Sequence, residues 1–162
     1  MMKVLVDYPS DEEEFVIVQR VTGPAVAVTA VATTEQLAEL QSACRQVYVD
    51  PSLMQYAVRL VSATRTPEKH DLKDLRRLMT YGASPRATIN LIEGARALAM
   101  LRGRTYVLPE DVTDLVHDVF RHRVSLSYEA LSDGLTPDAV ISKIMAKIPP
   151  PAKPLEHEKL AA

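Results

Sequence analysis

The sequence predicts an all-α protein, a helical bundle with at most minor short strands. Apolar residues recur at helical spacing along most of the chain, and proline or a capping residue stands where most of these stretches begin. Aromatic residues make up only 5% of the chain, and a predominance of Ala, Val, Leu and Ile suits closely packed helices. With 162 residues, of which 47% are hydrophobic, the chain can bury one core of ordinary size.

The first segment predicts a short strand followed by a helix. Residues 4–6 are Val-Leu-Val and favour extended structure. Ser10 can cap a helix over residues 10–21, whose acidic first turn suits the positive end of the helix dipole. Gly23 ends this helix, and the Ala-, Val- and Thr-rich stretch up to residue 32 is expected to be a connecting loop.

The spacing of Thr33 and Gln36 predicts a capping box and a second helix that runs to about Gln46. Its apolar stripe, expected to face a core, consists of Leu37, Leu40 and Cys44. Because Cys44 is the only cysteine, no internal disulfide can form, and we interpret it as a small core residue. This cysteine usage fits a reducing compartment. Since the start also lacks a signal peptide and no apolar run could span a bilayer, we expect a cytoplasmic protein.

A third helix is expected after a short extended piece at residues 47–49. Asp50 and Pro51 form a typical helix start, and the helix should end near Arg65 because Pro67 follows. The charged stretch 68–79 predicts one more short helix.

A long helix is expected over residues 85–102. Ser84 can cap it, Pro85 suits the first helical position, and Gly103 can close it. Its inward stripe consists of Leu91, Ile92, Ala95, Leu98 and Ala99. At about 100° per residue, Arg86 points away from that stripe and should face outward.

The remaining elements are two helices that begin at Pro109 and Pro137. The predicted domain organisation is therefore a leading segment over residues 1–9, a helical domain over 10–148, and a proline-rich or polar tail over 149–162.

Arg86 breaks a local rule, because a cation in the first turn of a helix faces the positive end of the helix dipole. This placement typically costs about 0.3 to 1 kcal/mol unless an anion lies nearby. The surrounding segment 59–104 is rich in Lys and Arg, whereas both flanking segments are acidic, so a phosphate-bearing partner is plausible there. The alternative is a solvated arginine on an ordinary polar helix face.

Several kinds of catalytic motif are absent from the sequence. It contains no GxxxxGK[ST] loop to cradle phosphates and no GxSxG elbow. His117 and His122 are five residues apart, which is the wrong spacing for two metal ligands on one helix face, and no cysteine pair could complete a zinc site. We therefore expect no metal site and no independent catalysis by this chain.

Segments across residues 4–150 together resemble the C-terminal part of MoxR-type AAA+ ATPases. The matching segments are Tyr8-Pro9 with Glu14, Val47-Tyr48-Val49-Asp50-Pro51, Ala63-Thr64-Arg65, Gly82-Ala83-Ser84-Pro85-Arg86-Ala87, Gly103-Arg104-Thr105-Tyr106-Val107 with Pro109-Glu110-Asp111-Val112, and His122-Arg123. The resemblance implies the small helical lid of the ATPase, with residues 1–9 as the end of the nucleotide-binding core or a linker.

The resemblance also implies functions for particular residues. Arg86 matches the sensor-two arginine, which reaches from the lid to the γ-phosphate of ATP on the large subdomain. Ser84 and Arg65 are further candidates near the nucleotide. The Walker motifs, sensor-one residue and arginine finger of the family have no counterpart here, so ATP and Mg²⁺ would be held mainly outside this chain.

As partners, the resemblance implies the large AAA+ subdomain, a homo-oligomeric ring of hexameric type, and a protein with a von Willebrand A domain, with no membrane or nucleic acid. The parent would act as a chaperone-like remodelling or maturation ATPase. The rival hypothesis is a free-standing helical module that binds nucleic acid or an acidic protein. Its basic surface would consist of Arg76, Arg77, Arg86, Arg96, Arg102 and Arg104.

Overall fold

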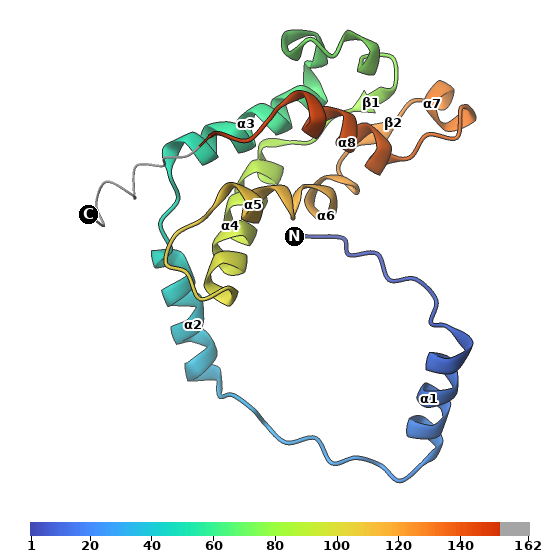
Figure 1. The fold of residues 1–162 in the computed structure, drawn as a ribbon, viewed down its shortest axis with the longest axis vertical. Coiled ribbons are helices and arrows are strands. Elements are labelled where there is room, and N and C mark those ends of the chain that lie inside the picture. The colour runs from blue at the N-terminus through green and yellow to red at the C-terminus, as the bar shows by residue number, and fades with distance from the viewer. Residues whose placement is uncertain (153–162) are drawn as a thin grey trace.

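The computed structural model describes residues 1–152 and is mainly helical (Figure 1). The α-helices are α1 (Asp11–Thr22), α2 (Thr34–Gln46), α3 (Pro51–Arg65), α4 (Pro85–Leu101), α5 (Pro109–Thr113), α6 (Val116–Phe120), α7 (Tyr128–Ser132) and α8 (Pro137–Lys147). Two short 3-10 helices, η1 (Pro67–His70) and η2 (Lys73–Leu75), and two strands, β1 (Met79–Tyr81) and β2 (Ser125–Leu126), complete the described elements. The predicted all-α class with minor strands is confirmed.

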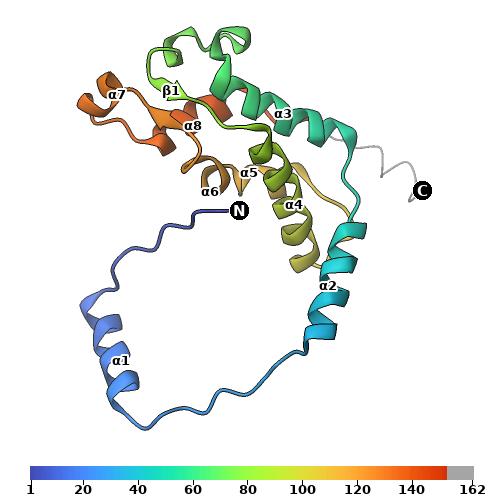
Figure 2. The ribbon, with the colours of Figure 1, turned by 180° about the vertical axis from the view of Figure 1, so that it is seen from behind.

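α1 stands apart from the other helices, as both views show, whereas the N-terminal end of the chain lies beside α6 (Figures 1 and 2). α1 begins as predicted, with a capping box in which Ser10 Oγ accepts from the Glu13 N–H and the Glu13 carboxylate accepts from the Ser10 N–H. The strand predicted at residues 4–6 is wrong. These residues are extended but have no partner strand in the described part of the chain, and a strand needs a neighbour to pair its backbone.

α2 is capped as predicted by Thr33 and Gln36, but its apolar stripe does not face a core in this chain. Leu37 and Leu40 are 53% and 50% exposed. Cys44 is half-buried, so the prediction of a core cysteine is only partly right. Leu37 and Leu40 therefore lack a covering element among residues 1–152, although α2 packs against α4.

The core lies between α3, α4, α5, α6 and α8, which pack against one another. α3 and α4 begin at their prolines as predicted, and α4 ends at Leu101, one residue earlier than expected. Gly103 follows with a positive φ of 72°, a left-handed conformation that glycine adopts without strain. The largest fully buried side chains include Tyr56, Phe120, Leu53, Leu60, Leu91, Ile141 and Ile144.

Three local features differ from the predictions. The single helix expected from Pro109 is divided into α5 and α6 by a turn at residues 114–115. The short helix expected in stretch 68–79 is replaced by η1 and η2. β1 and β2 form an unpredicted antiparallel pair, with Met79 opposite Leu126 and Tyr81 opposite Ser125.

The extended piece predicted at residues 47–49 is confirmed as a parallel bridge between Tyr48 and Tyr106. The core begins nearby, since residues 1–43 are all exposed and Val47 is the first buried residue of the described chain. The predicted domain boundary at residue 10 stays a prediction. Most of the predicted tail, residues 153–162, lies outside the described residues.

Candidate functional site

The segment before Arg86 is fixed to the end of α3 by a buried threonine. Thr64 Oγ1 accepts a hydrogen bond from the Ala83 N–H at 2.8 Å and donates one to the Val61 carbonyl at 2.7 Å. Thr64 and Ala83 are 2% and 0% exposed. Because an unsatisfied buried N–H is costly, this contact holds the chain that enters α4 in one position.

Gly82 makes the close approach between this segment and α3 possible. A Cβ atom at position 82 would lie 2.2 Å from the Thr64 carbonyl oxygen, so any other residue would force the backbone apart. The same atom would lie 2.9 Å from Cγ of Arg65. The structure thus brings Arg65, a predicted site residue, beside the segment that carries Ser84 and Arg86.

Ser84 occupies the N-cap position of α4, but its side chain makes no capping hydrogen bond. Only its backbone takes part in the helix start, where the Ser84 carbonyl accepts from the Ala87 N–H at 2.8 Å. The prediction that Ser84 caps the helix with its side chain is therefore wrong. The exposed Ser84 hydroxyl does not cap α4.

Arg86 lies in the first turn of α4 and is exposed, as predicted. Its guanidinium forms no hydrogen bond or ion pair with any residue of the described chain. The first turn of α4 also contains no acidic residue. A cation thus stands at the positive end of a helix dipole without an internal anion.

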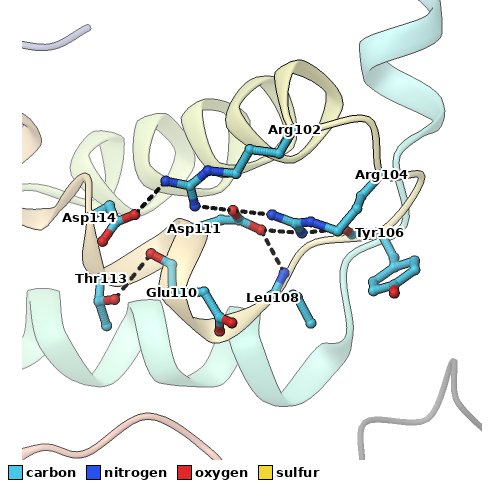
Figure 3. A network of polar contacts seen from close by, with 8 residues as sticks. All are labelled: Arg102, Arg104, Tyr106, Leu108, Glu110, Asp111, Thr113 and Asp114. Carbon is cyan, nitrogen blue, oxygen red and sulfur yellow. Dashed lines mark hydrogen bonds and ion pairs between the residues drawn. The ribbon is translucent and has the colours of Figure 1, made fainter.

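Residues 102–114, which include the matching segment that begins at Gly103, form a buried ionic network around Asp111 (Figure 3). The fully buried Asp111 carboxylate accepts two hydrogen bonds from Arg104, at 2.6 and 2.7 Å, and one from Arg102 at 2.8 Å. It also accepts from the Leu108 N–H at 2.8 Å, which caps α5. Arg102 bonds Asp114 as well, at 2.7 Å. The network ties the end of α4 to the start of α5.

The acid–base character of Asp111 follows from these contacts. Burial raises the pKa of its carboxyl, but hydrogen bonds from Arg104, the Leu108 N–H and Arg102 outweigh burial and lower the pKa from its usual value of 3.8. Hydrogen bonds to Asp114 and then to Asp111 raise the pKa of Arg102, and the bonds to Asp111 raise the pKa of Arg104. The carboxylate and both guanidiniums are therefore charged at neutral pH.

This network weakens the rival basic surface. Arg102 and Arg104 are directed at Asp111, and Arg77 pairs with Glu129 at 3.0 Å. Arg96 is half-buried, and its Nε has no hydrogen-bond partner in the described chain. Of the six arginines proposed, Arg76 and Arg86 remain exposed and without a carboxylate partner among residues 1–152.

His117 and His122 lie in separate contacts. His117 Nε2 lies 3.0 Å from Ser142 Oγ, whereas His122 contacts Arg123. No group of three or more potential metal ligands occurs within residues 1–152. In the same part of the chain, no helix is both long enough and apolar enough to cross a bilayer.

The sequence analysis missed Thr64 and the central role of Asp111. The hydroxyl of Thr64 bonds Ala83, 19 residues away, which no local sequence pattern predicts. A signal for Asp111 was present in the sequence, since Arg102 and Arg104 closely precede the acidic helix start at residues 109–112. Only the turn at Gly103 brings all three side chains together.

Comparison with known proteins places this geometry in a family. Residues 73–144 match the AAA lid domain family. The chain is 39% identical to Chaperone MoxR1 of Mycobacterium tuberculosis over 91% of this chain and 39% of that protein. Protein MoxR of Paracoccus denitrificans is 40% identical over 65% of this chain and 32% of that protein. The crystal structure of a candidate ATPase from Cytophaga hutchinsonii matches 94% of this chain and 47% of its own, with 33% identity and a TM-score of 0.88.

The helical region from η2 into α8 is thus an AAA lid domain, the small helical module of AAA+ ATPases. The chain belongs to the C-terminal region of the MoxR family of these ATPases. It spans less than half the length of each of these relatives.

Proposed function

We propose that Arg86 is the sensor-two arginine of a MoxR-type AAA+ ATPase. It would contact the γ-phosphate of ATP held, with Mg²⁺, by a large nucleotide-binding subdomain outside this chain. The observation that carries this proposal is an exposed Arg86 at the start of α4 without an internal anion, while Arg102, Arg104 and Arg121 are all paired with carboxylates. Arginine suits this role because its guanidinium stays charged and can bond two phosphate oxygens at once.

This arrangement would couple the nucleotide state to domain motion. Since Arg86 lies on the lid and the nucleotide on another subdomain, ATP would favour a closed arrangement that loosens after hydrolysis. Thr64 and Gly82 supply the rigid base that such a contact needs, because they fix the start of α4 to α3. Movement of Arg86 would therefore move the packed lid with it.

Two neighbouring residues are secondary candidates in the same proposal. The Ser84 hydroxyl makes no capping bond and can donate to a phosphate oxygen. Arg65 lies against Gly82 and can add a second positive charge near the start of α4. Both are exposed.

The exposed apolar side chains of the N-terminal segment support contact with the large subdomain. Those of α1 are Phe15, Val16, Ile17, Val18 and Val21, which are 42–78% exposed. Exposed apolar patches of this kind mark interaction sites on soluble proteins. A homo-oligomeric, hexameric ring, a von Willebrand A domain partner, a cytoplasmic location and chaperone-like remodelling remain part of the proposal through the family resemblance.

The test is the ATP turnover of the full-length parent protein carrying Arg86→Ala. We expect turnover to fall about tenfold or more, since removal of one preorganised contact to a developing charge commonly has at least that effect. Arg59→Ala is the matched control because Arg59 is also exposed, on α3. An Arg86→Ala protein that is folded, as judged by its circular dichroism, and turns over ATP at the parental rate would refute the assignment.

A further inference from the structure

The small antiparallel sheet brings two motif segments together. Tyr81 of β1 lies opposite Ser125 of β2, so the chain leaving β1 toward Arg86 runs beside the chain that enters β2 from Arg123. These segments are about forty residues apart in sequence, and the pairing was not predictable from either one. His122 and Arg123 therefore belong to the same edge of the lid as Arg86.

The guanidinium of Arg123 is held in place from one side. Its Nη1 donates to the Val119 carbonyl one turn earlier and lies 2.5 Å from His122 Nε2. Burial and the charge of Arg123 lower the pKa of His122, so the imidazole is neutral at neutral pH and can accept this bond. Nη1 of the half-buried guanidinium is thus bonded to the protein, whereas the other guanidinium nitrogens remain available to bond a ligand.

Arg86 and Arg123 lie close enough for their charges to interact. Burial and the charge of Arg86 lower the pKa of Arg123. Neither side chain has a carboxylate partner within residues 1–152, although the nearby Arg121 pairs with Asp118 at 2.5 Å and Asp138 at 3.1 Å. Two guanidiniums held near each other without an internal anion repel, and a shared anion would relieve this repulsion.

We propose that Arg123 is a second phosphate-binding residue that acts together with Arg86. Arg123 provides a guanidinium oriented by His122 and the Val119 carbonyl, and Arg86 provides an exposed guanidinium without an internal partner in residues 1–152. An oligophosphate bound between them would receive hydrogen bonds from both guanidiniums. This inference rests on the proposed function of Arg86 and adds a residue on a different element of the lid.

The test uses the 162-residue chain and inorganic tripolyphosphate at constant ionic strength, with binding measured by isothermal titration calorimetry. We expect Arg86→Gln and Arg123→Gln each to weaken binding at least fivefold. The double variant should bind tripolyphosphate only slightly less tightly than the single variant with the lower affinity, because the two side chains share one anion. Arg59→Gln removes the same charge from the exposed face of α3 and should stay within twofold of the wild type.

Each outcome separates the two proposals. Loss of binding in Arg86→Gln alone would overturn the role of Arg123 and leave that of Arg86 standing. Loss in Arg123→Gln alone would contradict the Arg86 assignment, and equal loss in Arg59→Gln, or no binding by the wild type, would overturn the shared site. If Arg123→Gln lowers the thermal unfolding midpoint, the affinity of Arg123→Lys is measured instead, since lysine keeps the positive charge but not the planar guanidinium. Wild-type affinity in Arg123→Lys would also overturn the inference.

Discussion

At the scale of single residues, the lid separates arginines that hold the fold from arginines that face outward. Arg102 and Arg104 converge on Asp111, whose side chain is fully buried. Arg86 has no such partner in the described chain, and its environment differs in burial and in charge. The sequence places Arg102 and Arg104 near Asp111 along the chain, but only the folded turn at Gly103 shows that the three side chains meet.

Asp111→Asn tests the structural group. The amide would leave two guanidiniums facing a neutral group, and removal of one partner from a buried ion pair commonly costs about 3–5 kcal/mol. Because the Arg102 side chain is 41% exposed, solvent screening reduces this, and we expect a loss of about 2–4 kcal/mol in the free energy of unfolding by urea. The control Asp114→Asn, at a carboxylate 48% exposed, should lose less than about 1 kcal/mol.

The same variant should change how stability depends on pH. The folded pKa of Asp111 is lowered below its unfolded value, so the stabilisation is fully present above the unfolded pKa and is lost as the pH falls through the folded pKa. The wild type should therefore lose stability from about pH 4 downward. Unfolding free energies at pH 7 and pH 3 provide the measurement, and an equal acid-induced loss in Asp111→Asn would show that Asp111 is not its source.

At the scale of secondary structure, the helices were predictable because their start signals are local. Ser10, Thr33, Pro51, Pro85 and Pro137 each stand at or next to the first residue of a helix. The strands were not, because β1 and β2 are three and two residues long and their pairing depends on residues about forty-five positions apart. The position of Arg86 was thus predictable, whereas its proximity to Arg123 was not.

Gly82→Ala tests the contact that positions the start of α4. The added Cβ would meet the backbone carbonyl of Thr64, which cannot turn away like a flexible side chain, so we expect a loss of about 3 kcal/mol. Gly134→Ala is the control, because its φ is 71° but no atom lies within 4 Å of the added Cβ, and about 1 kcal/mol is expected. Chemical denaturation measures both. Equal losses in the two variants would mean that the segment before Arg86 is not tightly fixed to α3.

At the scale of the whole molecule, the described chain consists of a packed helical region and an N-terminal segment that contributes no buried residue before Val47. Within residues 1–152, two hydrogen bonds join Lys3 to the packed region: its N–H donates to the Asp118 carbonyl at 2.8 Å, and its carbonyl accepts from Arg121 at 2.7 Å. Bonds of this exposed kind contribute little to stability. The apolar surface of residues 1–32 thus affects association more than folding.

Removal of residues 1–32, which retains Thr33 and the capped helix α2, should therefore leave the free energy of unfolding within about 1 kcal/mol of the full chain. It should also reduce binding of a hydrophobic dye, because the exposed apolar side chains of α1 and its flanks are absent. Urea denaturation and dye fluorescence measure the two effects in the same samples. A loss above about 2 kcal/mol on removing residues 1–32 would show that the segment is an integral part of the helical core, because surface segments without buried contacts have no means of contributing that much.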